Sequence, residues 1–374
     1  MGIGRFSLTP LLPVMQTEAG LTLVQGTWLA TANYVGYLAG ALACMMLSPR
    51  PERAMRQGLL WVALLTVPMG LNQHVAVWIV CRVLAGAASA FVFVGVSAWV
   101  LPQLALHRKE KWSSLVFSGV GIGTAVAGIL VLACSALELR YDAMWLALAG
   151  LAGAVALIIG SKPLGSETPT VARHATTLKA EPIGRDVIVA AICYSAFGYA
   201  YIIPATYLPT LAHSYIADPL MFGWIWPLFG VAAAISTVAI AWLSRSASPR
   251  QVWIWMQWVL AVGVLAPALI VSSLTLLLSA ACAGGSFMVI TMAGLREAYR
   301  LGRGRETRVI ALMTASFGVG QIAGPLVVGL FGGSTGSLVE PSIAAAIALA
   351  ISNLVLYATQ NRIRNPDVSE HTAS

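Results

Sequence analysis

Long apolar segments separated by short polar gaps extend along nearly the whole chain of 374 residues. A helix that crosses a membrane needs about 20 mostly apolar residues. Eleven segments come near this length and a shorter one precedes them, so the pattern predicts an all-α integral membrane protein with twelve transmembrane helices. The expected helices cover residues 1–15, 23–47, 58–72, 75–102, 112–136, 142–161, 186–210, 219–244, 251–271, 274–296, 308–331 and 341–361.

Basic side chains occupy every second gap between these segments. Nineteen of the 22 Lys and Arg residues lie in those gaps or in the C-terminal tail, whereas the remaining gaps contain only Arg140. Positively charged loops stay in the cytoplasm during membrane insertion. The pattern therefore predicts a multi-pass protein of the cytoplasmic (inner) membrane with its C-terminus in the cytoplasm.

The composition fits a membrane environment. Hydrophobic residues make up 58% of the chain and charged residues 10%, whereas soluble domains have roughly 25% charged residues. The net charge of +8 is spread over short loops that would face anionic lipid headgroups. We therefore expect a monomer in a lipid bilayer, with no nucleic-acid partner. All five cysteines lie in expected helices without a CxxC pair, which indicates apolar packing rather than a metal or cofactor site.

The longest polar stretch divides the chain into two halves. Residues 162–185 are rich in Gly, Pro, Ser and Thr, a composition typical of a flexible connection. We predict an N-terminal six-helix bundle over residues 1–161, a cytoplasmic linker over 162–185, a C-terminal six-helix bundle over 186–361 and a cytoplasmic tail over 362–374.

The two halves repeat each other at corresponding helices, which supports a parallel repeat about an axis along the membrane normal. The first and seventh helices share a pattern, in which Gly4, Arg5 and Pro10 match Gly198, Tyr199 and Pro204. The fifth and eleventh helices share another, with Phe117, Gly119, Gly121 and Gly128 in the fifth and Phe317, Gly318, Gly320 and Gly324 in the eleventh.

The first expected helix is shorter than its counterpart in the second half. Fifteen residues span about 22 Å at 1.5 Å per residue, less than the roughly 30 Å of the hydrocarbon core. The seventh helix begins twelve residues before Gly198. Either the first helix is truncated or the true start lies about eight residues upstream of Met1, and the shortfall against the membrane thickness favours the second.

Twelve helices in two repeats with a central polar loop resemble the major facilitator superfamily of secondary transporters over essentially the whole chain. The opening residues 2–13, GIGRFSLTPLLP, are similar to the signature of its YbfB/YjiJ branch. Residues 82–86, RVLAG, resemble the superfamily's Arg-x-x-x-Gly element. Many exporters of the superfamily have a Gly-Pro element in the fifth helix, whereas here it occurs in the eleventh, at Gly324 and Pro325. The direction of transport therefore stays open.

The resemblance implies a secondary active transporter that moves a small organic solute by alternating access. Two other classes of membrane protein are the alternatives. A membrane enzyme would need an acid/base pair, a nucleophile or a metal cluster at membrane depth, and the sequence offers no such group. A membrane-embedded sensor or scaffold would normally carry a soluble domain, whereas no loop exceeds about 25 residues.

Two arginines lie inside apolar segments, where a charged side chain costs several kcal/mol and indicates function by default. Arg5 lies about 16 Å from the outer end of its helix, near the midplane. Its planar guanidinium suits a carboxylate or phosphate, which favours an anionic solute, although a structural arginine bonded to backbone carbonyls or tyrosines is the alternative. Arg82 is shallower, and its motif favours helix packing or gating over solute contact.

Other polar and small residues complete the candidate site. Together with Arg5, we expect solute contacts from Asn33, Tyr37, Tyr199, Tyr201, Trp226 and Gln321. Glycines with small-xxx-small spacing permit close helix packing, and we expect packing or gating, together with Arg82, from Gly86, Gly119, Gly123, Gly320, Gly324 and Pro325.

Carboxylates are missing from the expected helix interiors. All 14 Asp and Glu residues map to loops or helix ends, as do the five histidines. A proton relay in a transporter normally needs such a group inside the membrane. Glu18 is the best available candidate for a residue that carries a proton. Whether a proton is coupled to transport stays open.

Overall fold

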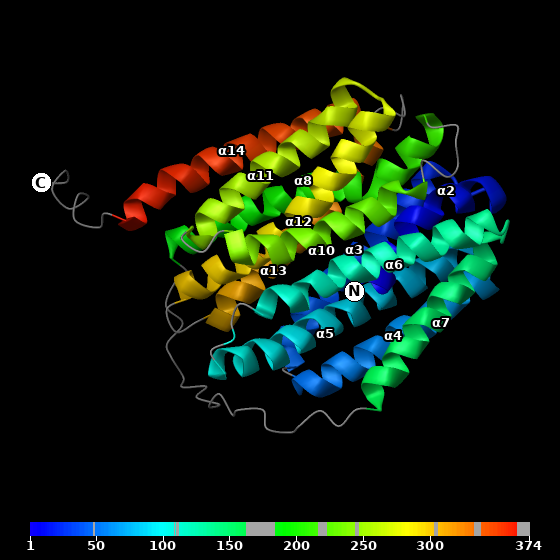
Figure 1. Ribbon diagram of the computed structural model, residues 1–374, viewed down its shortest axis with the longest axis horizontal. Helices are drawn as coiled ribbons and strands as arrows, with labels where there is room; N and C mark the ends of the chain where they lie inside the picture. The colour runs from blue at the N-terminus through cyan, green and yellow to red at the C-terminus, as the bar shows by residue number, and fades with distance from the viewer. Residues whose placement is uncertain are drawn as a thin grey trace, which may run out of the picture.

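The computed structural model describes residues 1–47, 49–107, 109, 112–161, 184–215, 223–243, 247–302, 306–332 and 338–364. Most of the expected linker and tail lies outside these residues. Within them, the regular secondary structure is helical (Figure 1), which confirms the all-α fold. Nine of the described helices are long and apolar enough to cross a membrane.

Each expected transmembrane segment has a helical counterpart. The first expected helix corresponds to α1 and α2 together. The helices of the first half are α1 (Gly2–Phe6), α2 (Leu8–Glu18), α3 (Leu23–Leu47), α4 (Pro51–Leu71), α5 (Val75–Leu106), α6 (Ser113–Ala136) and α7 (Tyr141–Gly160). Those of the second half are α8 (Arg185–Tyr215), α10 (Ile225–Leu243), α11 (Pro249–Leu269), α12 (Ser273–Gly302), α13 (Glu306–Gly332) and α14 (Val339–Arg364).

The same neighbours recur in both halves. Helix α5 packs against α3 and α4, and α4 packs against α7. In the second half, α12 packs against α10 and α11, and α11 packs against α14. Contacts between the halves also come in a matched pair, because α3 packs on α13 and α6 packs on α10. Helix α2 adds a contact with α8, so the innermost helices of the two halves lie against each other.

Large apolar side chains cover much of the outside of the bundle, including exposed residues such as Trp28, Leu157 and Leu354. In water such a surface would be a liability, whereas lipid tails are as apolar as leucine. All five cysteines are free thiols, and four of them are buried. We call the end of the bundle with Gly160 and Arg185 the linker end, and the opposite end, with Glu18 and Leu269, the hairpin end.

Several charged residues expected in loops lie within helices. Arg250 belongs to α11 and Glu297 to α12, and both side chains are 3% exposed. Arg250 Nε lies 3.0 Å from Glu297 Oε1, and Arg300 Nη1 lies 3.2 Å from Glu297 Oε2. The expectation that every carboxylate lies in a loop or at a helix end is therefore wrong for Glu297. Its burial is tolerated because two cations pair with it.

Candidate functional site

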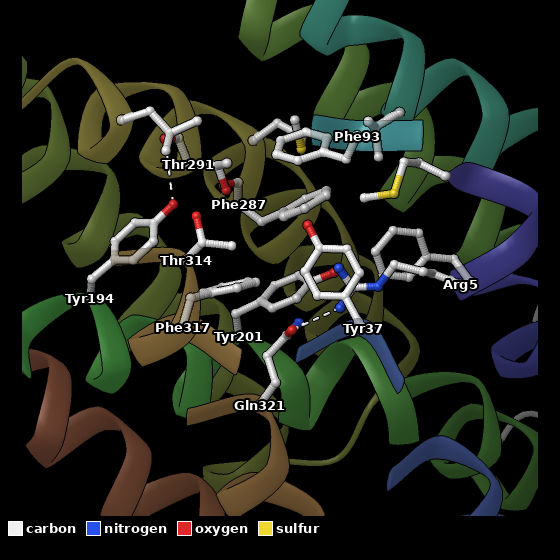
Figure 2. A pocket seen from close by; sticks show the side chains of 15 residues that line it. Arg5, Tyr37, Phe93, Tyr194, Tyr201, Phe287, Thr291, Thr314, Phe317 and Gln321 are labelled. Carbon is white, nitrogen blue, oxygen red and sulfur yellow. Dashed lines mark hydrogen bonds between the residues drawn. The ribbon is translucent and has the colours of Figure 1, made fainter. Parts of the chain in front are cut away.

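A small cavity lies between the two halves, lined from α1, α3, α5 and α6 on one side and α8, α12 and α13 on the other (Figure 2). Its volume of about 30 Å³ is enough for about two water molecules, whereas pockets for organic ligands measure roughly 300–1,000 Å³. The bundle is therefore closed around this site. Met1 is part of the lining, and the N-terminus lies about midway along the bundle in Figure 1.

Arg5 is the central polar group of the cavity. Its side chain is buried, at 4% exposure, and Nη2 donates to Gln321 Oε1 across 2.8 Å. The guanidinium carbon lies 3.9 Å from the ring centroid of Tyr37, a cation–π geometry. Among the described residues, no carboxylate forms an ion pair with Arg5. The cavity therefore contains a positive charge that the described side chains do not neutralise.

Three buried polar atoms of cavity-lining side chains have no hydrogen-bond partner within the described part of the chain. They are Arg5 Nε, the Tyr201 hydroxyl and Gln321 Nε2. Buried polar groups are nearly always hydrogen-bonded, so each exception requires an explanation. Their common position around one cavity indicates that they can serve a polar ligand or water.

Aromatic rings from the second half form one wall of the cavity. The rings of Tyr201 and Phe287 are stacked, with centroids 4.6 Å apart and an interplanar angle of 16°. Phe317 lies against the Tyr201 ring at 6.2 Å and 25°. Phe6, the residue after Arg5, meets Phe287 edge-on at 5.9 Å. This wall is thus contributed by α8, α12 and α13 and reaches the first half through α1.

The first transmembrane segment is interrupted beside the cavity. Helix α1 ends at Phe6 and α2 begins at Leu8. Pro10 has no N–H group, and its ring crowds the carbonyl group of Phe6 four residues earlier. Carbonyl groups at a helix end need other donors. The interruption therefore exposes polar backbone at the depth of Arg5.

Arg82 of α5 supplies such donors. Its Nη1 donates to Gly4 O at 3.2 Å, and its Nη2 donates to Arg5 O at 2.9 Å. Asn33 Nδ2 donates to the carbonyl of Arg82 at 3.0 Å. Arg82 does not line the larger cavity, and it borders a smaller one of about 10 Å³. In this structure Arg82 therefore holds the end of the helix that carries Arg5.

The structure brings together four of the seven side chains expected to contact the solute. Arg5, Tyr37, Tyr201 and Gln321 line the larger cavity (Figure 2). Asn33 instead bonds to backbone, as described above. Trp226 lies behind Phe6 and stacks on Phe229, with centroids 4.8 Å apart.

Tyr199 requires a correction, because it lies outside the cavity. Its hydroxyl donates to the carbonyl oxygen of Pro341 in α14 at 3.3 Å. Two residues along a helix are separated by about 200° around its axis. Tyr199 and Tyr201 therefore point to opposite sides of α8, and only Tyr201 lines the cavity.

The candidate packing residues differ in their surroundings. A Cβ atom on Gly86 would overlap the carbonyl oxygen of Asn33, and one on Gly320 would overlap that of Ser195. Gly324 similarly abuts the side chain of Ile202. A Cβ atom on Gly123 would lie 3.3 Å from Gly2 Cα, whereas one on Gly119 would meet no atom within 4 Å. Pro325 is buried inside α13.

Gly119 thus makes no close helix contact, contrary to expectation. It is exposed on α6, on a face that no other helix covers closely. The spacing of the glycines predicts which of them share a face of α6. It does not predict whether another helix packs against that face.

Sequence reasoning missed several lining residues, which are Phe93, Phe287, Thr291 and Thr314. Phe317 was expected only as a marker of the repeat. The only sequence signal for the missed phenylalanines is that they are aromatic residues within transmembrane segments. That signal does not discriminate, because Phe197 and Phe229 are equally buried and lie outside the lining.

Titratable carboxylates and imidazoles do not contribute to the lining. None of the fifteen described residues around the cavity is Asp, Glu or His. Glu18 Oε2 accepts a hydrogen bond from the backbone N–H of Tyr141 at 2.8 Å, which caps the start of α7. The described residues contain no group of three His, Cys, Asp or Glu side chains that could hold a metal ion.

An apolar helical bundle with two similarly packed halves and a central cavity between them is the architecture of many secondary transporters. A family model described as "uncharacterised MFS-type transporter YbfB" matches residues 1–357. The chain belongs to this family of the major facilitator superfamily, as its resemblance predicted. It is therefore a multi-pass membrane protein of a transporter family, and the family points to a transporter rather than an enzyme.

Proposed function

We propose that the protein is a secondary active transporter that carries a small organic anion across the cytoplasmic membrane by alternating access. The observation that supports an anion is the state of Arg5, a buried cation in the central cavity without a described carboxylate partner. A charge at that depth is expensive unless it is paired. A carboxylate on the solute would supply the pairing during transport.

The geometry around Arg5 suits recognition of a carboxylate. Guanidinium groups bind carboxylates through two parallel N–H···O bonds. Nη2 of Arg5 is occupied by the neutral oxygen of Gln321, whereas Nε has no described partner. An incoming carboxylate could bind Nε and displace Gln321, whose amide would then be free to turn its N–H groups toward the ligand.

Alternating access is supported by contacts between the halves on the hairpin side of the cavity. Thr9 Oγ1 donates to the carbonyl of Ala205 at 3.0 Å. The hydroxyls of Tyr34 and Thr206 lie 2.9 Å apart, and those of Thr27 and Tyr207 lie 3.1 Å apart. Together these bonds join α2 and α3 to one short stretch of α8. We propose that they close the hairpin end and separate when the cavity opens to that side.

The proposal includes the orientation and division of the chain. We propose that residues 1–161 and 186–361 rock as two units, that 162–185 and 362–374 lie in the cytoplasm, and that the protein works as a monomer in the inner membrane. The linker end then faces the cytoplasm. A coupling proton, if one is used, would be carried by the solute or by a group beyond the fifteen lining residues.

The test is binding by the purified full-length protein in detergent. Benzoate, succinate and acetate are the anionic probes, with benzylamine as the cationic one and benzyl alcohol as the neutral one. Ligand binding raises the thermal unfolding temperature, and isothermal titration gives the affinity. Arg5→Gln should weaken anion binding about tenfold or more, since a hydrogen bond to a charged group contributes about 1.5–3 kcal/mol. Arg5→Lys should restore it in part, because an ammonium lacks the planar fork.

Arg140→Gln is the matched control, because Arg140 is exposed and pairs with Asp142 away from the cavity. It should leave the affinities unchanged. Unchanged anion affinity in well-folded Arg5→Gln protein, or binding of the cationic or neutral probe alone, would overturn the proposal.

A further inference from the structure

From the lining of the cavity we infer that the solute is an aromatic monocarboxylate. The inference rests on the proposed function, because it takes the cavity around Arg5 as the solute site and adds the number of charges and the kind of body that the site accepts.

The described side chains that line the cavity provide one cation that is free to bind a charged group. Arg5 retains an Nε without a described partner. Arg82, the nearby second arginine, already uses both Nη atoms on the carbonyl oxygens of Gly4 and Arg5. No Lys or further Arg is present among the fifteen lining residues. One anionic group is therefore matched, whereas a second would be buried without a cationic partner.

Aromatic residues are the most numerous kind in the remainder of the lining. Seven of the fifteen lining residues carry an aromatic ring. Tyr201 stacks face to face on Phe287 at 4.6 Å, and Phe317 lies within 25° of parallel to Tyr201, so the three rings form a stack at this side of the cavity. A planar ring in the cavity can meet this stack in an offset or an edge-to-face arrangement, the two that aromatic pairs prefer. Figure 2 shows this wall beside Tyr37 and the guanidinium of Arg5.

The charged and aromatic parts are adjacent, at a distance suited to a compact solute. The Arg5 guanidinium lies 5.3 Å from the Phe6 ring centroid, and Phe6 meets Phe287 at 5.9 Å. Phe287 in turn stacks on Tyr201 at 4.6 Å. Once the cavity opens far enough to admit a solute, a carboxylate attached directly to a ring, or through one or two carbons, would contact both parts at once.

The side of the cavity away from Arg5 is neutral. Thr291 and Thr314 line it, and their hydroxyls donate to backbone carbonyls of their own helices. The Tyr194 hydroxyl donates to the carbonyl of Thr291 at 3.5 Å. Ring faces are electron-rich, so a second carboxylate on this side would meet neither a cation nor a free described hydroxyl donor. Dicarboxylates and phosphate should therefore be rejected.

The experiment compares anions that differ in one property, using the purified full-length protein. Benzoate and cyclohexanecarboxylate have the same charge and similar size and differ in aromaticity, whereas terephthalate adds a second charge. We expect benzoate to bind about threefold to tenfold more tightly than cyclohexanecarboxylate. We expect no saturable binding of terephthalate, succinate or inorganic phosphate at concentrations that saturate with benzoate.

Two phenylalanine variants test whether the wall causes this preference. Phe287→Leu should reduce the ratio of benzoate to cyclohexanecarboxylate affinity to about one. Phe229→Leu is the matched control, because Phe229 is buried in the same ring cluster but does not line the cavity. If Phe287→Leu does not fold, Phe93→Leu removes a lining ring on the opposite side and should lower the same ratio.

Failure of this inference and failure of the proposed function give different binding results. Equal or tighter binding of cyclohexanecarboxylate by the wild-type protein, or terephthalate binding as tight as benzoate binding, overturns the aromatic monocarboxylate while leaving an Arg5-dependent anion site intact. Anion binding that does not depend on Arg5 overturns the proposed function itself.

Discussion

The guanidinium of Arg82 holds the backbone of Arg5, with Nη2 donating to the Arg5 carbonyl oxygen at 2.9 Å. One buried arginine therefore fixes the helix end that carries the other. The hydrogen bond to Gly4 and the contact of Asn33 with the Arg82 carbonyl extend this arrangement over α1, α3 and α5. The direction in which Arg5 enters the cavity consequently depends on residues that do not touch the cavity.

Removing the Arg82 guanidinium should lower stability. Arg82→Gln would leave carbonyl groups at the end of α1 without their charged donor, and each buried group left unsatisfied costs about 1–3 kcal/mol. We expect a lower unfolding temperature in detergent and a weaker benzoate affinity, because the Arg5 side chain loses its support. Arg82→Lys should recover part of the stability, since one ammonium can still donate to a carbonyl oxygen. An unfolding temperature equal to that of the wild type would contradict this role.

The ion pair of Arg250 and Glu297 should be more important to stability than exposed pairs. Breaking a buried pair by removing one partner typically costs about 3–5 kcal/mol, so Glu297→Gln should unfold at a clearly lower denaturant concentration. Arg140→Gln breaks an exposed pair with Asp142 and should change the free energy of unfolding by about 1 kcal/mol or less. The double variant Arg250→Met, Glu297→Leu should recover much of the loss, because it leaves no buried charge unpaired and the Arg300 side chain is 52% exposed. Similar effects of the two single variants would contradict the interpretation.

Two glycine-to-alanine variants should separate packing glycines from exposed ones. A methyl group at Gly86 would overlap the carbonyl oxygen of Asn33, and overpacking of this kind costs about 1–3 kcal/mol. At Gly119 a methyl group meets no atom within 4 Å. There alanine should be neutral or stabilise the helix by up to about 1 kcal/mol. Thermal unfolding of both variants side by side measures the difference, and equal losses would show that Gly119 is packed in the membrane.

The proposed orientation can be tested by labelling with a membrane-impermeant maleimide. We expect Ser166→Cys, in the linker, to be protected in intact cells and labelled after permeabilisation, because the basic loops stay in the cytoplasm. Arg140→Cys should be labelled in intact cells, since Arg140 is exposed at the hairpin end. Labelling of Ser166→Cys from outside would reverse the orientation.

The sequence alone determined the helical fold, and it singled out Arg5 as the central residue of the candidate site. In a bilayer every backbone polar group must be bonded internally, so long apolar segments can only become helices or barrel strands. Their lengths favoured helices, and the helical fold followed. Arg5 was also identifiable, because a charge inside an apolar segment is costly enough to demand an explanation.

The tertiary structure decided which side of each helix faces the cavity. In a soluble protein a polar face would mark the outside of a helix, but here both the lipid and the interior are apolar, and the pattern carries little of that information. Tyr199 and Tyr201 are therefore equivalent in sequence, and only packing directs Tyr201 inward and Tyr199 toward Pro341. The burial of Glu297 likewise depends on Arg250, which is 47 residues away along the chain and becomes a neighbour only when α11 packs against α12.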